Sequence, residues 1–364
     1  MFLKKFWWKL LAAALILVVL NRGLLTPLKH GIVDLSPTRV QAGTTAGIEV
    51  IAYNSHYDRD PAAVRAYLRP HRPASPHHEG ELLLAASSVE VQSANRLRLK
   101  FDLPAFLPDP QKLAAFSLIV DSPGDGPAVI PGKLIIGQDS IREEDGVRAW
   151  TSRERPEFSE RRKHWFPYRN ILVETIRNTF FHVSLWFAMF LLLALSVYYS
   201  VRYLRHPIAD YDLRAFALVR TAMLFGLLGC LTGSLWARYT WETWWTTDIK
   251  LNMAALTLLI YLAYWVLRLS IEDPDRRRRI SAAYNAFALA AVIPLIFVLP
   301  RLTDSLHPGS GGNPAIGADD MDNALRMVFY PSVLGFMLLG LWLASLLYRV
   351  ERLEAWHEDG ENIF

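Results

Sequence analysis

The amino-acid sequence predicts a mainly α-helical, polytopic membrane protein with six membrane-spanning helices and an extracytoplasmic, β-sandwich-like insert between the first and second spans. Three observations lead to this fold class. Six apolar stretches approach the roughly 20 residues that a helix needs to cross hydrocarbon. Lys and Arg residues cluster near the ends of those stretches. Between the first two stretches, short runs of alternating polarity replace the long apolar ones.

The composition agrees with a chain that lies partly in lipid and partly in water. Its 364 residues are 52% hydrophobic and 20% charged, too apolar for an ordinary soluble protein and too charged for one held wholly in the membrane. The net charge of +4 comes from short clusters and forms no basic face, which argues against nucleic-acid binding. The single cysteine, Cys230, excludes an intrachain disulfide, a cysteine-based zinc site and the C-x-x-C-H motif of covalent haem attachment.

The six apolar stretches set the expected spans. They cover residues 5–24, 181–203, 213–235, 251–269, 281–300 and 326–348. The first also resembles a secretory signal, because a positive start precedes a short apolar run. The stretch NRGLLTPLKH that follows has no small-x-small cleavage pattern, which favours an uncleaved anchor.

The basic clusters orient the chain, because Lys and Arg in short loops stay on the cytoplasmic side of a membrane. Those near the span ends are Lys4, Lys5, Lys9, Arg202, Arg205, Arg268, Arg276 to Arg279, Arg349 and Arg352. All of them face the cytoplasm when both termini do, and the run DPDRRRR is then a topology signal. Residues 25–180, 236–250 and 301–325 are therefore expected outside.

Four parts follow along the chain. We expect a first transmembrane helix over residues 1–24, a β-rich extracytoplasmic insert over 25–165, a five-span membrane domain over 166–350 and a cytoplasmic tail over 351–364. In the insert, short runs such as SVEVQ and RLRLKFDL, separated by Pro, Gly, Ser and Asn, favour a small antiparallel sandwich.

The insert carries no catalytic constellation. Its clustered histidines, His71, His77 and His78, fall in the Pro-rich stretch RPHRPASPHHEG. Without cysteine or acidic partners at ligand spacing, a solvated loop is favoured over a metal site. We expect the insert to dock a partner or to shield a site in the membrane domain.

Two histidines are expected at the outer side of the membrane. His182 stands in the first outer turn of the second span, and His307 stands just beyond the fifth. Each alone is equally well explained as an interfacial hydrogen-bonding residue, although ionisable residues at this depth usually face a bundle interior or cavity. A neutral imidazole binds iron, and a haem held six-coordinate without covalent attachment needs one on each axial face. The pair is therefore a candidate set of haem ligands.

The stretch TWETWWTTDIKL, with one tryptophan just before it, offers flat aromatic walls to a haem. The four tryptophans are Trp236, Trp241, Trp244 and Trp245. An aromatic belt at the membrane interface explains one or two of them, but not four in ten residues beside an acid. Asp248 is interpreted either as orienting a ligand and the loop backbone or as the N-cap of the fourth span.

Three motifs, in order along the chain, resemble the CcmC type of haem-handling proteins in cytochrome c maturation, a family with a CcsA-like tryptophan-rich signature. The signature T-G-S-x-W-G-x-x-x-W-G-x-W-W-x-W-D-x-R-L is matched at Thr232, Gly233, Ser234, Trp236, Trp241, Trp244, Trp245, Asp248 and Leu251. The family's two histidine motifs are matched at His182, Val183, Leu306, His307, Gly309 and Ser310. The resemblance covers residues 1–24 weakly and 165–348 well, and it leaves the insert out.

The chain departs from the family pattern at a few positions. Ala237 and Glu242 replace glycines, Thr247 replaces the third tryptophan of W-W-x-W-D, Lys250 replaces arginine and Ser184 replaces proline. These departures spare both candidate iron ligands. They bear on how the edge of a haem would be packed.

The resemblance implies haem delivery without bond chemistry, so the chain is not expected to be an enzyme. Haem b, as a transient cargo, would be bound by His182 and His307, with the tryptophan loop against its outer edge. The implied location is the outer face of the bacterial inner membrane. The implied partners are a periplasmic haem chaperone, the subunits of an ABC transporter and a small single-span subunit of the maturation complex.

Three other functions remain open at this stage. A cytochrome c haem lyase, which makes thioether bonds, usually has more spans and a further histidine pair. A membrane b-type cytochrome usually places its ligands within spans on facing helices, whereas both histidines here lie at the rim. A sensor with a passive membrane part leaves the tryptophan loop unexplained.

Overall fold

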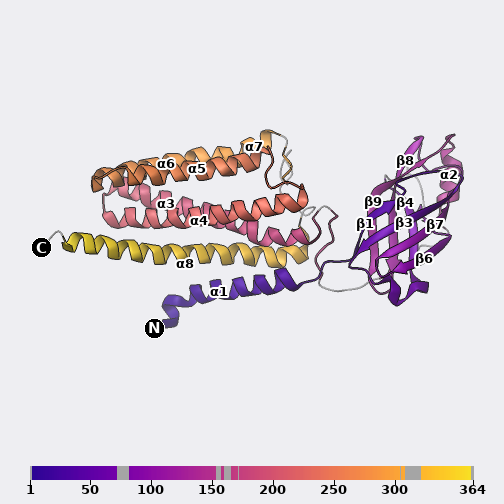
Figure 1. The fold of residues 1–364 in the computed structure, drawn as a ribbon, viewed down its shortest axis with the longest axis horizontal. Helices are drawn as coiled ribbons and strands as arrows, with labels where there is room; N and C mark the ends of the chain where they lie inside the picture. Colours follow the sequence, from indigo (N-terminus) through magenta and orange to yellow (C-terminus); the bar gives the residue numbers. More distant parts are fainter. Residues whose placement is uncertain are drawn as a thin grey trace. The chain divides into compact units, whose positions relative to one another are not determined.

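A computed structural model describes residues 2–71, 82–152, 157–159, 165–170, 172–303, 305–307 and 321–361. The chain forms two compact units (Figure 1). One unit comprises Met1–Thr26 and Glu174–Phe364 and is helical, and the other comprises Pro27–Val173 and is rich in strands. The predicted fold class, a mainly helical membrane protein with a β-rich insert after its first long helix, is confirmed.

In the described part of the chain, six helices are long and apolar enough to cross a membrane, as predicted. They are α1 (Phe2–Leu25), α3 (Asn178–Arg205), α4 (Ala209–Thr240), α5 (Ile249–Leu269), α6 (Pro274–Phe297) and α8 (Asn323–Glu361). The four-residue helix α7 (Leu299–Leu302) follows α6. Uninterrupted helices suit these apolar sequences because a helix satisfies its own backbone hydrogen bonds in lipid.

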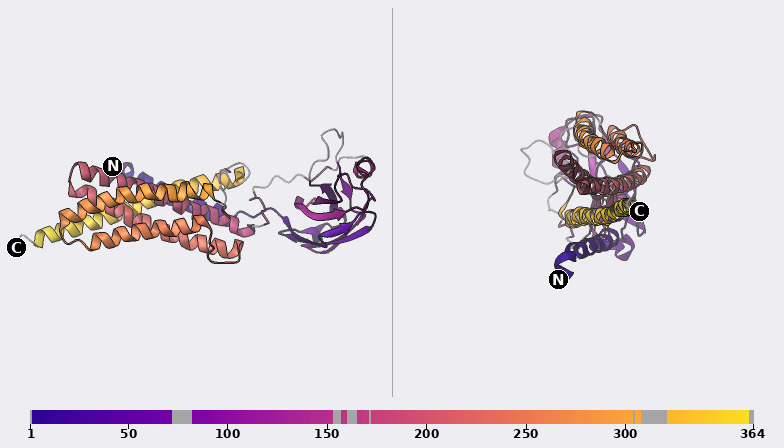
Figure 2. Two further views of the ribbon diagram at one scale, coloured as in Figure 1. Left: turned by 90° about the horizontal axis from the view of Figure 1, so that it is seen from above. Right: turned by 90° about the vertical axis from the view of Figure 1, so that its left-hand side faces the viewer.

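Helix α3 is central to the helical unit. It packs against α4, α6 and α8, while α1 packs on α8 and α5 packs mainly on α6 (Figure 2). Apolar side chains from five of these helices fill the core between them, including Leu192, Phe225, Tyr261, Val292 and Ala344. This packing positions the start of α3, the end of α4 and the start of α5, from which most of the candidate site residues come.

A buried ion pair joins α4 to α5. Arg268, one of the basic residues expected in a loop, is only 7% exposed. Its Nη1 and Nη2 atoms donate to Asp212 Oδ1 and Oδ2 at 2.8 and 2.5 Å, and its guanidinium carbon lies 4.2 Å from the centre of the Phe216 ring. A charge removed from water is retained only when it is paired in this way.

The insert contains two β-sheets. In spatial order, the first sheet consists of β1 (Gly31–Ser36), β3 (Thr45–Tyr53), β7 (Arg96–Asp102) and β6 (Ser88–Ser93). The second consists of β2 (Arg39–Gln41), β9 (Gly126–Gly137), β8 (Leu113–Ser122), β4 (Arg65–Pro70) and β5 (Leu84–Ala85). All of these strand pairs are antiparallel except β2 with β9, and the helix α2 (Glu143–Trp150) follows β9.

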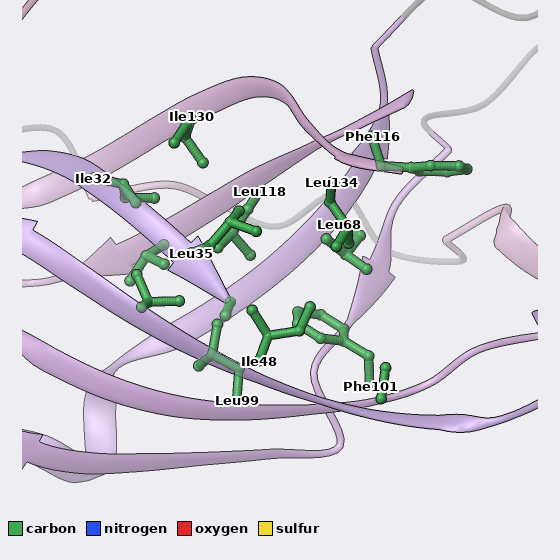
Figure 3. Close-up of a cluster of buried hydrophobic side chains, with 14 of the residues drawn as sticks. Ile32, Leu35, Ile48, Leu68, Leu99, Phe101, Phe116, Leu118, Ile130 and Leu134 are labelled. Carbon is green, nitrogen blue, oxygen red and sulfur yellow. The ribbon is translucent and has the colours of Figure 1, made fainter. Parts of the chain in front are cut away.

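Alternating polarity builds the core of the insert. Exposed and buried residues alternate along β3 and β7, and Ile48 pairs with Leu99 across these two strands. Side chains of the two sheets meet in one buried cluster, in which Phe101, Leu118 and Leu134 are fully buried (Figure 3). Because side chains alternate sides along a strand, each sheet contributes one apolar face to this core.

Only one of the three clustered histidines of the insert lies in the described part of the chain. His71 Nδ1 lies 3.3 Å from the Ser117 hydroxyl, whereas His77 and His78 fall outside the described residues. Within those residues no group of three or more His, Cys, Asp or Glu side chains is arranged to hold a metal ion.

The two ends of the insert are joined by backbone hydrogen bonds. Lys29 N–H donates to the Phe166 carbonyl at 2.7 Å, and Phe166 N–H donates to the Pro27 carbonyl at 2.9 Å. In the helical unit, Arg177 Nη1 donates to the carbonyl oxygens of Gly23 and Thr26 at 2.9 and 2.7 Å. The chain therefore leaves α1 and returns to α3 through paired segments.

Candidate functional site

His182 lies one turn into α3 and faces α4. Its Nδ1 is 3.0 Å from the carbonyl oxygen of Gly229 and 3.1 Å from the hydroxyl oxygen of Thr232. A carbonyl oxygen only accepts hydrogen bonds, so we assign the proton to Nδ1. The Nε2 atom then keeps its lone pair and has no hydrogen-bond partner among the described residues, which is the form of imidazole that binds a metal.

A glycine on α4 makes room for the His182 ring. A Cβ atom added at Gly233 would lie 2.7 Å from Cε1 of His182, closer than real side chains approach. Gly229, one turn earlier on the same face, has its Cβ position 2.9 Å from the Trp186 ring. These two glycines let α3 and α4 approach closely enough for the imidazole to reach the Gly229 carbonyl.

Asp248 is the centre of the second half of the site. Its carboxylate accepts hydrogen bonds from the backbone N–H groups of Lys250 and Leu251 and so caps the first turn of α5. The same carboxylate accepts from the Ser305 hydroxyl at 2.8 Å and from the Leu306 N–H at 2.7 Å. It thereby ties the start of α5 to the segment that follows α7.

His307 lies in that segment and is oriented by Asp248. Its Nδ1 is 3.0 Å from Asp248 Oδ1, so the carboxylate fixes the proton on Nδ1, and Nε2 keeps the lone pair with which an imidazole binds a metal. Both interpretations of Asp248 that the sequence left open, helix cap and orienting group, agree with this geometry. The carboxylate oxygens are occupied by these hydrogen bonds.

The ionisation of these groups favours metal binding. Burial opposes ionisation of Asp248, but hydrogen bonds from Leu306 and Ser305 and the nearby His307 outweigh it, so the pKa of the carboxyl lies below its usual value. For His307, burial disfavours the charged imidazolium and lowers the pKa. The nearby Asp248 carboxylate raises this pKa but only partly offsets the effect of burial. At neutral pH the pair is thus a carboxylate beside a neutral imidazole.

The four predicted tryptophans divide into two pairs. Trp236 meets His182 edge to face, with ring centres 5.8 Å apart, and Trp241 meets His307 in the same way at 5.1 Å. Trp244 and Trp245 are 59% and 40% exposed, and within the described residues neither ring contacts a histidine ring. Trp236 and Trp241 therefore flank the candidate ligands, while the other two face outward.

Sequence reasoning missed Trp186. Its ring centre lies 6.2 Å from that of His182, and it packs against Gly229. Trp186 is four residues after His182 on α3, and residues four apart lie on the same helix face. That spacing was the signal that could have identified it.

The loop geometry shows why the family pattern has glycine at a position where this chain departs from it. Glu242 occupies a glycine position of the signature and has a φ of 61°, in the left-handed region that glycine adopts most easily. The carbonyl of Glu242 accepts a hydrogen bond from Arg238 on the last turn of α4. This contact holds the turn that leads from α4 into the tryptophan loop.

Comparisons with known proteins show which family the chain resembles. Residues 168–359 match the CcmC family, described as heme exporter protein C. Proteins named heme exporter protein C include one from Bradyrhizobium diazoefficiens, 31% identical over 45% of this chain and 62% of its own length. Those of Paracoccus denitrificans and Escherichia coli K12 are 30% and 27% identical, over 49% and 38% of this chain and 73% and 54% of their own lengths. The match of this chain to the Bradyrhizobium protein thus covers less than two thirds of that protein.

Proposed function

The chain belongs to the heme exporter protein C family, and from this premise we propose that it binds haem at the outer face of the bacterial inner membrane and presents it for transfer during cytochrome c maturation. The observation that carries the proposal is the pair of histidines whose Nδ1 atoms are both engaged by acceptors. Two neutral imidazoles with free Nε2 atoms are suited to the two axial positions of one haem iron.

Each predicted residue has a distinct role in this proposal. His182 and His307 are the axial ligands, and Trp236 and Trp241 border the porphyrin beside them. Trp244 and Trp245 cover its outer edge with exposed rings that can stack on a flat macrocycle. Asp248 acts through His307 as a positioning residue, because its carboxylate is already occupied by donors from α5 and from residues 305–307.

Haem b is proposed as cargo and not as a resident group. His307 lies outside the helices, so one ligand can leave without unfolding a span. Both termini are proposed to be cytoplasmic, with the insert and the site on the periplasmic side. The receiving partner is proposed to be a periplasmic haem chaperone, and ABC transporter subunits and a small single-span subunit complete the complex. No bond chemistry is assigned to the chain itself.

A transfer experiment tests the proposal. The purified chain is loaded with haem and mixed with the apo form of the haem chaperone, and haem in each protein is measured as its pyridine haemochrome. We expect the chain to lose haem to the chaperone. Haem that stays in place would support a b-type cytochrome instead. When apocytochrome c is added as the acceptor of thioether bonds, a haemochrome shift to that of thioether-linked haem would support a lyase.

The contact between Gly233 and His182 yields a further prediction. Gly233→Ala places a Cβ where the His182 ring lies, so the ring must leave the Gly229 carbonyl. Loss of such an outer-shell partner typically weakens metal binding by about 10–100-fold, and we expect haem affinity to fall by about tenfold. Haem titration followed by absorbance measures the change.

Gly226→Ala is the matched control for this prediction. It lies on the same helix and also crowds its neighbours, but those neighbours are the ends of the Leu258 and Met189 side chains. We expect its haem affinity to stay near that of the wild type. Equal affinities for the two variants would show that the His182 contact has no part in binding.

A further inference from the structure

Two hydrogen-bond donors at the outer end of α4 have no partner among the described residues. They are Nε1 of Trp236 and the hydroxyl of Thr240, and both atoms are buried. Residues four apart lie on one face of a helix, so the two donors are one turn apart on the same side of α4. Trp236 is also the ring that meets His182. The unused donors therefore stand beside a proposed iron ligand.

Thr240 differs from three other threonines of the long helices. The hydroxyls of Thr221, Thr232 and Thr257 each donate to the carbonyl four residues earlier, at 2.8 to 2.9 Å. The equivalent bond from Thr240 to the Trp236 carbonyl is not made within the described structure. A buried donor left unpaired is unfavourable, so a hydroxyl that gives up its usual local acceptor indicates another acceptor.

We propose that Trp236 Nε1–H and Thr240 Oγ1–H bind a carboxylate of the tetrapyrrole cargo, so that the site recognises the acidic edge of the macrocycle as well as its iron. This inference rests on the proposed function. A carboxylate accepts several hydrogen bonds, and bonds to a charged acceptor are stronger than neutral ones. Thr240 occupies a variable position of the family signature, so this contact is a property of this chain.

The charges at this end of the bundle permit an anion. The C-terminus of α4 carries a partial negative charge, which alone would oppose a carboxylate there. Arg238 stands on the same last turn, and the ammonium of Lys250 is close enough to act electrostatically on both His182 and His307. The two positive charges offset the partial negative charge of the helix end, while the Asp248 carboxylate acts on Lys250 in the opposite sense.

Haem and its dimethyl ester, in which both carboxylates are masked, separate this contact from iron ligation. We expect Thr240→Val to bind haem about tenfold more weakly than the wild type and to bind the ester as the wild type does. Trp236→Phe keeps an aromatic ring and removes the N–H, so it should weaken the binding of haem more than the binding of the ester. Thr221→Val removes a hydroxyl from the same helix that already has an acceptor, and it should bind both ligands like the wild type.

Three results would overturn the inference. In the first, Thr240→Val lowers the affinity for haem and for the ester equally, and in the second it leaves both affinities unchanged. In the third, it lowers the thermal midpoint of the haem-free chain, which the loss of an unpaired donor should not do. In each case the wild type still binds haem, so the proposed function survives. A wild type that binds neither ligand would instead overturn the proposed function itself.

Discussion

His182→Ala and His307→Ala are each expected to convert the haem complex from a six-coordinate, low-spin spectrum to a high-spin spectrum. Each variant should also retain about 100-fold less haem, because loss of an axial ligand exceeds the roughly 10–100-fold effect of losing an outer-shell partner. Absorbance spectra and pyridine haemochrome content of the purified proteins measure both effects. A variant with the spectrum and haem content of the wild type would remove that histidine from the ligand set.

Two controls make this test specific. His206→Ala changes an exposed histidine at the opposite end of α3 and should leave haem content unaltered. Free imidazole should restore the low-spin spectrum of His182→Ala, because the space left by the ring is walled by Gly229, Gly233, Trp186 and Trp236. Failure of imidazole to bind there would indicate that the helix pair has collapsed.

Asp248→Asn is expected to have the second largest effect. The two carboxylate oxygens accept from α5 backbone N–H groups, from Ser305 and Leu306 and from His307. The amide NH₂ of asparagine would replace one acceptor with donors and face at least one N–H or O–H group. Haem affinity should therefore fall by about 10–100-fold, with a partial loss of the low-spin spectrum.

Asp273→Asn is the control for that prediction. Asp273 caps α6 by accepting from the Arg276 N–H and touches no residue of the candidate site. The Asp273→Asn variant should therefore have a slightly changed stability and bind haem like the wild type. Similar haem loss in both variants would mean that helix capping, and not the orientation of His307, accounts for the effect of Asp248→Asn.

The fold was largely predictable because its signals are local. Each span is a continuous apolar stretch, and the strands β3 and β7 alternate strictly between exposed and buried residues. Strand pairing is different, since β2 and β9 pair in parallel across nearly a hundred residues, with Arg39 opposite Ile135. No local pattern specifies such a partner. Helix ends were also longer than hydropathy suggests, as α4 continues to Thr240 and α8 to Glu361.

The candidate site was predictable as a set of residues but not as a geometry. Its histidines and tryptophans stand out by type and by position relative to the spans. Which tryptophan meets which histidine depends on the close approach of α3 and α4 at Gly229 and Gly233, which the sequence does not reveal. The unpaired Thr240 hydroxyl could not be foreseen either, because helical threonines ordinarily bond to their own helix.

The paired segments at the two ends of the insert bear on how such a chain arises. Phe166 is hydrogen-bonded to both Pro27 and Lys29. The chain between Lys29 and Phe166 therefore begins and ends at adjacent positions. Arg177 independently joins the start of α3 to the end of α1. A module attached through such adjacent ends can be gained or lost as a unit while the helices on either side keep their spacing. The helical unit can thus carry such an inserted fold without a change in its own helices.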